Sequence, residues 1–336
     1  MSIDMDSHFT FHNNRRATII AIAFFVVFSV IPIGLIGAYR WVSDTFTKQV
    51  TTQQQTLSDI AALAINVKLD RLVNIASSLA SSSQLESDAA NGQWTAAAAV
   101  ARDAENNVAF YDPFIDRIIV YDTNGVQQAA YPELTGGLGT QASVSGWYGA
   151  LSGGTQASYV SGVTKRISSP QIQVVNIAVP IIANKRAVGF LVLQIPTDNF
   201  LDFGGNLSLG TYGFAYIVDA SGNLVANPKY LSDTNGAVVN YSFVPQVKKV
   251  LAGGNGTDIV LDQGSGEKSI ITYQPVPGYG WGVVVQELYS EAFSGVSSAL
   301  VDIMLLIVLA WMADVVLACI LYQYIVLHHH NHEHTQ

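Results

Sequence analysis

Residues 116–132, DRIIVYDTNGVQQAAYP, and residues 214–228, FAYIVDASGNLVANP, follow one plan, and this plan decides the fold. In each stretch an apolar strand pattern ends in an aspartate, a turn containing Gly and Asn follows, and a proline lies after a second strand pattern. Gly and Asn between two strand patterns are a hairpin signal. The repetition predicts a duplicated antiparallel sheet domain.

Other segments extend the pattern on both sides. Residues 171–195 and 267–288 each read as two strands joined by a turn, the first turn lying near Asn184. Residues 43–88 contain no Pro or Gly, and their apolar residues recur at steps of three and four, which predicts one long helix. A shorter helix is expected over residues 93–109, after Asn91–Gly92.

The amino-acid composition indicates a protein with membrane-spanning segments. Only 12% of the residues are charged, whereas about 25% is usual in soluble proteins. Residues 17–39 are uncharged and would span roughly 35 Å as a helix, enough for a bilayer core of about 30 Å. Residues 303–327 form a second apolar run with one charge, Asp314. A cleaved signal peptide is the rival interpretation of the first run, but no small-residue cleavage site follows it.

The predicted fold is α+β, with two transmembrane helices flanking a long stalk helix and two tandem antiparallel-sheet modules. Arg15 and Arg16 precede the first apolar run, which favours cytoplasmic termini and an extracytoplasmic sensor domain at the cell membrane. The expected segments are a cytoplasmic tail 1–16, transmembrane helix 17–39, stalk helix 40–92, membrane-distal module 93–203, membrane-proximal module 204–297, second transmembrane helix 298–327 and cytoplasmic tail 328–336.

Several functional classes are disfavoured by composition. The net charge is −9 and no cluster of Lys and Arg exceeds two residues, so nucleic-acid binding is not expected. All seven histidines lie in the two tails, and the one cysteine is Cys319 in the second apolar run. Ser-His, Cys-His and His-ligated zinc chemistry are therefore excluded between the apolar runs. We expect no enzyme, no cofactor and no metal site there; the His-rich end, 328–336, is a metal chelator, a polar helix stop or a tag remnant.

The order of motifs resembles the double Cache sensor ectodomains of bacterial receptors. The resemblance rests on IIVYDTNG, SVSGWYGAL, YVSGV, VNIAVPI, VGFLVLQI, GFAYIVDASGNLVANP and YQPVPGYGWGVVVQE, and it covers roughly residues 45–295. It implies two PAS-like modules, of which the membrane-distal one holds a small ligand. Each motif is modest alone, and their order and spacing carry the match.

The resemblance also suggests a ligand site. In amino-acid-binding members an Arg lies two residues before the Trp-Tyr pair and grips the ligand carboxylate, and an Asp ends the GFLVLQI strand and holds the ligand amine. Ser145 and Gln194 occupy these two positions here, and Thr140 replaces a further tyrosine. The candidate ligand-binding residues are Tyr121, Ser145, Trp147, Tyr148, Tyr159 and Gln194.

The loss of both charged residues changes the expected ligand. A buried zwitterion needs a bidentate Arg and an acid, because an unpaired buried charge is costly. We therefore expect neutral polar or cationic ligands rather than α-amino acids, while Lys165 or Arg166 leaves small anions open. The alternative is that Trp147 and Tyr148 only cap the sheet core.

Three acidic residues and one tryptophan outside the candidate site also have expected roles. Asp122 and Asp219 each precede a turn and are expected to form it. Trp281 is expected in the core. Asp314 either makes a hydrogen-bonded contact between helices or stays protonated in the bilayer.

The expected function is a membrane-anchored sensor that binds a small molecule in the distal module and signals across the membrane. It would lack its own output domain and act on a separate cytoplasmic or membrane partner, with homodimerisation through residues 43–80 also open. The alternatives are a sensory fragment of a longer chemoreceptor or histidine kinase, and a ligand-free structural or adhesive ectodomain.

Overall fold

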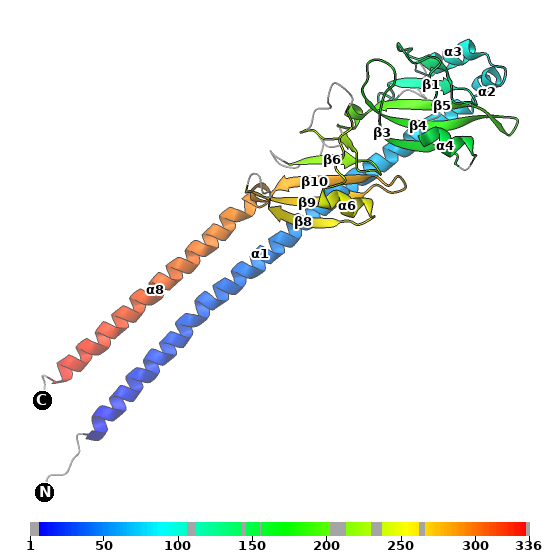
Figure 1. The fold of residues 1–336 in the computed structure, drawn as a ribbon. Coiled ribbons are helices and arrows are strands. Elements are labelled where there is room, and N and C mark those ends of the chain that lie inside the picture. The colour runs from blue at the N-terminus through cyan, green and yellow to red at the C-terminus, as the bar shows by residue number, and fades with distance from the viewer. Residues whose placement is uncertain are drawn as a thin grey trace, which may run out of the picture. The chain divides into compact units, whose positions relative to one another are not determined.

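A computed structural model describes residues 7–105, 112–142, 146–154, 156–201, 213–229, 237–261 and 266–333. One compact unit comprises residues 51–292, and the chain on either side of it forms a second unit. Along the chain (Figure 1) the elements are α1 Ser7–Ala80, α2 Ser83–Ala90, α3 Trp94–Glu105, β1 Arg117–Tyr121, β2 Gln127–Tyr131, α4 Gly146–Ser152, β3 Tyr159–Lys165, β4 Gln173–Ala183, β5 Arg186–Pro196, η1 Thr197–Phe200, β6 Phe214–Val218, β7 Leu224–Ala226, α6 Pro245–Leu251, β8 Gly256–Leu261, β9 Lys268–Pro275, β10 Gly282–Leu288, α7 Tyr289–Ala292 and α8 Ser294–Glu333.

Two antiparallel sheets of the same topology form the larger unit. The first sheet has the order β2-β1-β5-β4-β3, and the second has the order β7-β6-β10-β9-β8. All strand pairs are antiparallel. The predicted duplicated α+β domain is therefore confirmed, with five strands in each copy.

The hairpins form where the turn signals lie. Strands β4 and β5 pair from Val174 opposite Pro196 to Ala183 opposite Arg186, and Asn184 and Lys185 make the turn with φ of 50° and 65°. Both residues occupy the left-handed region, which Asn tolerates better than most residues. The predicted turn near Asn184 is confirmed.

The two aspartates that precede the repeated turns both organise them. The Asp122 carboxylate accepts hydrogen bonds from the backbone amides of Asn124 and Val126, each at 2.9 Å. Asp219 accepts from the amides of Ser221 at 2.8 Å and Asn223 at 2.9 Å. The turn-forming role predicted for both is confirmed.

Asp219 has an additional partner in the first sheet. Its Oδ2 accepts a hydrogen bond from the amide of Val163 on β3 at 2.8 Å, within an irregular stretch of the β3–β4 ladder. A Cβ atom on the neighbouring Gly162 would lie 2.4 Å from the same oxygen, so only glycine leaves room for this approach. Asp219 thus joins the second sheet to the first.

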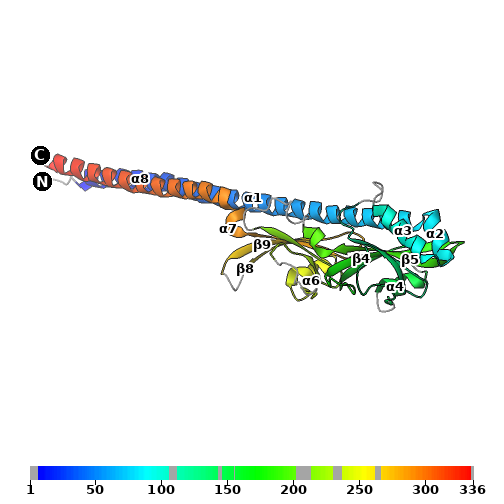
Figure 2. The ribbon, with the colours of Figure 1, turned by 90° about the horizontal axis from the view of Figure 1, so that it is seen from above.

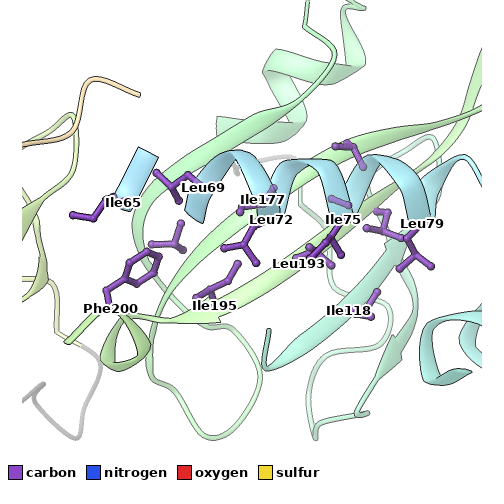
Figure 3. Packing of buried hydrophobic residues seen from close by; sticks show 14 of the residues in the cluster. Ile65, Leu69, Leu72, Ile75, Leu79, Ile118, Ile177, Leu193, Ile195 and Phe200 are labelled. Atoms are coloured by element: carbon purple, nitrogen blue, oxygen red, sulfur yellow. The ribbon is translucent and has the colours of Figure 1, made fainter. Parts of the chain in front are cut away.

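One helical layer covers the same face of both sheets (Figure 2). The C-terminal half of α1, together with α2 and α3, forms a continuous apolar cluster with both sheets. Figure 3 shows Leu69 and Leu72 of α1 close to Ile195 and Phe200. Trp281 is 1% exposed and its ring lies 5.8 Å from that of Phe200, so the predicted core position of Trp281 is confirmed.

The prediction of one uninterrupted helix from residue 43 to 88 is wrong, because the helix is interrupted between Ala80 and Ser83. Helix α1 ends at Ala80, and α2 begins at Ser83. Ser82 is extended, with φ −70° and ψ 130°, and its side chain accepts from the amide of Leu85 at 3.4 Å. The serine run ends α1 because serine side chains compete for backbone hydrogen bonds and favour N-cap positions. Of the predicted helix 93–109, residues 106–109 lie outside the described residues.

The apolar runs at 17–39 and 303–327 lie within α1 and α8, respectively. Over the described residues, no helix is both long enough and apolar enough to cross a membrane. The side chains of Asp314 and of the C-terminal histidines lie outside the described part of the chain.

Candidate functional site

The candidate site lies on the face of the first sheet that turns away from α1, which we term the α4 face. Side chains alternate along a strand, so Ile118 and Val120 of β1 join the α1 cluster, whereas Ile119 and Tyr121 point the other way. Figure 2 shows α1 and α4 on opposite sides of this sheet. The α4 face carries Ile119, Tyr121, Ala178, Phe190 and Val192, covered by Trp147 and Leu151 of α4.

Four aromatic rings pack together on the α4 face. The ring of Trp147 lies 5.0 Å from that of Tyr121, 5.6 Å from that of Phe190 and 5.9 Å from that of Tyr148. Tyr148 and Phe190 are 5.7 Å apart. These are the separations at which edge-to-face aromatic contacts are favourable. Trp147 is 3% exposed, so the rings form a dense cluster.

Helix α4 holds two of these rings in place. Residues 146–152 form a short helix whose buried Trp147 and Leu151 lie one turn apart. Tyr148 Oη donates a hydrogen bond to the carbonyl of Thr123 at 3.1 Å. The Tyr148 ring also lies 2.8 Å from where a Cβ atom on Gly125 would be. The β1–β2 turn and α4 therefore fix each other.

A row of polar side chains crosses the α4 face beyond the rings. Gln194 of β5 pairs in register with Arg117 of β1 and with Asn176 of β4. Gln194 Nε2 donates to Asn176 Oδ1 at 3.2 Å, and Asn176 Nδ2 donates to Thr164 Oγ1 at 3.0 Å. Gln194 Oε1 is buried and has no hydrogen-bond partner among the residues that the structure describes.

Arg117 is buried without an ion-pair partner. It is 2% exposed, and none of the ion pairs among the described residues includes it. Its Nε donates to the carbonyl of Pro132 at 3.0 Å, and its Nη1 donates to Ser168 Oγ at 2.8 Å. The Gln127 amide, with its oxygen turned toward the guanidinium, accepts from Nη2 at 3.2 Å. All of these partners are neutral.

A second buried arginine lies near Arg117. Arg166 is 3% exposed and forms an ion pair with Asp116, whose side chain is 39% exposed. Burial lowers the pKa of Arg117 from its usual value and the charge of Arg166 lowers it further, whereas Tyr121, Asp116 and Glu133 act in the opposite direction. Burial also raises the pKa of Tyr121 to about 12, against an opposing effect of Arg117. Arg117 therefore acts electrostatically on Tyr121, a member of the ring cluster.

The predicted site residues fall into three groups. Tyr121, Trp147 and Tyr148 meet in the ring cluster, and Tyr159 packs half-buried against it, with its Oη 3.0 Å from a Cβ position on Gly146. Gln194 lies in the polar row of the same face. Ser145 lies outside the described residues. Their role in ligand binding stays a prediction.

Phe190, Asn176 and Arg117 lie on the α4 face but were not among the residues predicted from the sequence. Arg117 belongs to the motif DRIIVYD, and strand alternation places it on the same face as Tyr121. An arginine inside an otherwise apolar strand was therefore an available signal. Of the two cations that the sequence analysis named, Arg166 is buried beside Asp116, whereas Lys165 is exposed.

Comparisons with known proteins agree on the architecture. Residues 42–296 match the Cache domain family in its double form, dCache_1. The ligand-binding domain of the Pseudomonas fluorescens chemoreceptor CtaA, in complex with L-isoleucine, is 15% identical and has a TM-score of 0.54, covering 75% of this chain and 97% of that domain. None of the curated proteins matches the chain.

Two further structures share the fold. The ligand-binding domain of the Pseudomonas aeruginosa PAO1 chemoreceptor PctB, in complex with L-Arg, is 17% identical with a TM-score of 0.53, covering 73% of this chain and 98% of that one. The periplasmic sensory domain of the Campylobacter jejuni chemoreceptor Tlp1 is 13% identical with a TM-score of 0.55, covering 74% and 98%. With most of its length matched and both sheets in place, the chain belongs to the double Cache family of sensor domains.

Proposed function

We propose that the chain is an extracytoplasmic sensor that binds a small molecule on the α4 face of its first sheet. The observation that carries this proposal is the α4 face itself, where buried, incompletely paired polar groups adjoin an aromatic cluster. Binding sites typically combine apolar walls with a few convergent polar groups. The related domains of CtaA and PctB hold L-isoleucine and L-Arg, which supports a small-molecule role.

The proposed ligand-contacting residues are the rings of Tyr121, Trp147, Tyr148 and Tyr159 together with Ser145 and Gln194. The sequence-based preference for neutral or cationic ligands over α-amino acids receives no support from the comparisons, because the related chemoreceptor domains bind amino acids. That preference also assumed that no buried cation replaces the arginine missing at Ser145. Arg117 is a buried cation on the α4 face, so this assumption does not hold, and amino acids are candidate ligands as well.

Signal transmission is proposed to run through the first sheet to α1. The sheet packs α4 on one face and α1 on the other, so a shift of the sheet changes its contacts with α1. Lys68 of α1 also pairs with the buried Asp112 just before β1, at 2.7 Å. A ligand changes the balance of two states only by its differential affinity, and about 1.4 kcal/mol gives a tenfold change.

Membrane anchoring by residues 17–39 and 303–327 belongs to the same proposal. Its support is their apolar composition and the exposure of apolar side chains along α8, for example Leu305, Trp311 and Val316 at 55–57%. A helix that is apolar on all sides is suited to a lipid environment. Extraction of membranes at alkaline pH tests this: the full chain should remain in the pellet, and release into the supernatant would contradict anchoring.

Pairing of two chains through α1 is a further part of the proposal. Ile60, Leu63 and Val67 are 54–58% exposed and lie along one stripe of the helix. In a variant with Cys319→Ser, disulfide cross-linking through Ile60→Cys is expected, whereas Ala62→Cys, at a position that is 1% exposed, should not cross-link. Equal yields from both positions would count against a dimer through this stripe. From α1 the signal is proposed to pass to an output module, either on this chain or on a separate partner.

A ligand-free structural domain is the second candidate function. One observation favours it: the four rings of the α4 face already contact one another at centroid distances of 5.0–5.9 Å. If the domain is structural, no metabolite should stabilise it. If it is a sensor, ligand must displace or open part of the ring cluster.

A thermal-shift screen of the full chain in detergent against metabolites distinguishes these functions. A ligand at about 100 times its dissociation constant stabilises the folded state by about 2.7 kcal/mol. Trp147→Ala should abolish the shift, while Trp41→Ala, which removes a 70% exposed tryptophan, should keep it. Melting of each variant without ligand shows whether it is folded. An unchanged ligand shift in the folded Trp147→Ala variant would refute the proposed site.

A further inference from the structure

An amide and a carboxyl group meet where α1 passes β10 of the second sheet. Gln54 of α1 is 4% exposed, and its Nε2 donates a hydrogen bond to Glu287 Oε2 near the end of β10. Val283 and Val285 of β10 belong to the α1 cluster, so strand alternation turns Glu287 toward the same helix. The contact is therefore a polar pair at the edge of an apolar interface.

The pair is incomplete on the amide side. Among the described residues, Gln54 Oε1 is buried and has no hydrogen-bond donor. An ionised carboxylate only accepts hydrogen bonds and cannot serve this oxygen, whereas a protonated carboxyl group carries one O–H donor. Gln54 and a protonated Glu287 can therefore exchange two hydrogen bonds, one in each direction. A buried acceptor without a donor costs free energy, so the second bond favours the protonated form of Glu287.

The surroundings of Glu287 also favour its protonated form. Burial raises the pKa of Glu287 above its usual value, and the negative charge of Glu291 on α7 raises it further. Both effects act against the ionised carboxylate, because burial removes water from a charge and two negative charges repel each other. Proton uptake by Glu287 is therefore easier in the folded chain than in a free glutamate.

The other elements beside this pair carry their charges at the surface. On α1, Lys48 and Asp59 are the charged residues nearest to Gln54 in sequence, and both are exposed. On β9, Ile270 lies opposite Glu287, and Lys268 is exposed. None of these three charges is among the causes of the raised pKa of Glu287, which are burial and Glu291.

We infer that Glu287 and Gln54 form an acid-strengthened contact that ties α1 to the end of β10. When Glu287 is protonated, the two side chains exchange two hydrogen bonds; when it is ionised, one bond remains and Glu291 repels the carboxylate. Helix α7 follows at Tyr289 and α8 begins at Ser294, so this contact acts on the segment that leads into α8. Acidity is thus an input besides the small molecule, and its role in signalling rests on the proposed path through α1.

The direction of the pH effect follows from the raised pKa of Glu287. A free glutamate titrates at about pH 4.3, so the folded chain takes up this proton at a higher pH than the unfolded chain. The stability that Glu287 contributes is complete below about pH 4.3 and is lost as the pH rises through the folded-state pKa. Glu287→Gln mimics the protonated form at every pH, because the glutamine amide offers Gln54 both an N–H donor and a carbonyl acceptor.

The test measures hydrogen–deuterium exchange of the full chain in detergent, without added ligand, at about pH 4 and about pH 7.5. The wild type is compared with Glu287→Gln at the same pH, because intrinsic exchange rates then cancel. Peptides of β10, α7 and residues 51–58 should exchange equally in both proteins at about pH 4 and about threefold or more faster in the wild type at about pH 7.5. Glu133→Gln, which removes an exposed carboxylate after β2, should behave as the wild type at both values.

A second variant covers loss of folding. If Glu287→Gln does not fold by circular dichroism, Gln54→Leu removes the acceptor and should exchange faster than the wild type at about pH 4, with a smaller ratio at about pH 7.5. A ratio between wild type and variant that does not change with pH, or the same change in Glu133→Gln, overturns the inference. A pH-dependent ratio in a chain that binds no metabolite supports the acid-strengthened contact and removes the proposed small-molecule function.

Discussion

The two sheets share a topology but differ on the face that turns away from α1. Beneath α4 the first sheet carries buried polar groups, Arg117 and Gln194, beside four aromatic rings. Beneath α6 the second sheet packs Val218, Val284 and the rings of Tyr216 and Tyr273 against Val247 of α6. The Lys249–Asp258 ion pair of the second sheet lies at its surface, where Lys249 is 47% exposed.

Features that the two sheets share are expected to serve stability, and features found in one sheet alone are candidates for function. Both copies use the same strand order, the same aspartate turn and the same packing on α1, so these features belong to stability. Buried polar groups that lack partners weaken a fold. Among the described residues such atoms occur at Gln54, Arg166, Gln194 and Gln274, and Gln194 is the one that shares the α4 face with the ring cluster. The first sheet is therefore the expected site of binding, and the second is expected to support it.

The largest expected effect comes from Asp219, one of the two turn aspartates. Asp219 is fully buried and also bonds to Val163, whereas Asp122 is half-buried and bonds within its own hairpin. Asp219→Ala should cost about 3–5 kcal/mol of unfolding free energy and Asp122→Ala about 1–2 kcal/mol, because buried donors are left unpaired. Urea unfolding measures both. Equal costs would mean that the bond between the sheets adds no stability.

The helix-facing cores of the two sheets should be equivalent. Ile177 on β4 and Ile270 on β9 occupy corresponding strands, and both are 0% exposed. Each change to alanine should cost about 2–5 kcal/mol through lost burial and cavity formation. Ile259, which pairs with Ile270 and is 48% exposed, is the matched control and should change stability by less than about 1 kcal/mol. A mild effect at Ile177 alone would show that the first core is loosely packed.

The stability of the chain at alkaline pH tests the burial of the Tyr121 hydroxyl. Burial raises the pKa of Tyr121 to about 12, so the folded chain keeps a proton that the unfolded chain loses from about pH 10 upward. Stability from this group is complete below pH 10 and is lost as the pH rises toward 12. Tyr121→Phe should reduce the loss of stability between pH 9 and 12 by up to about 2 kcal/mol. Identical pH profiles for wild type and Tyr121→Phe would contradict the burial of this hydroxyl.

The smallest expected effect is at the surface of the second sheet. Lys249 Nζ lies 2.6 Å from Asp258 Oδ2, and the hydrogen bond to Asp258 raises the pKa of Lys249. Exposed ion pairs contribute little because water and salt screen them. Lys249→Gln should leave the melting temperature and any ligand-induced shift unchanged. A lost ligand shift would place function on the second sheet and reverse the comparison.

Much of the fold follows from local sequence. Asn124–Gly125 and Asn184 mark hairpin turns by their backbone preferences, and the repeated aspartate turns identify the duplication. The break after Ala80 lacks Pro or Gly, so it depends on serine capping that competes weakly with helix continuation. Helix α4 contains Gly146 and Gly149, which disfavour helix, and buried Trp147 and Leu151 hold it in place through contacts with other segments.

The candidate site was less predictable than the fold, because it too depends on contacts between segments that are distant in sequence. Trp147, Tyr148 and Gln194 were identified through a family resemblance, which also directed attention to the absent arginine at Ser145. Arg117 is far from that position in sequence and reaches the α4 face only because β1 and β5 pair in the middle of the sheet. Tertiary pairing, which no local pattern specifies, brings the cation to the rings.

Hydrogen–deuterium exchange can show directly which of the two sheets binds the ligand. The full chain would be compared with and without the compound that gives the largest thermal shift, and exchange would be mapped onto peptides. With a ligand site beneath α4, we expect slower exchange in β1, α4 and β5 of the first sheet, with β6, α6 and β10 unchanged. Protection confined to the second sheet, or spread equally over both, would contradict a ligand site beneath α4.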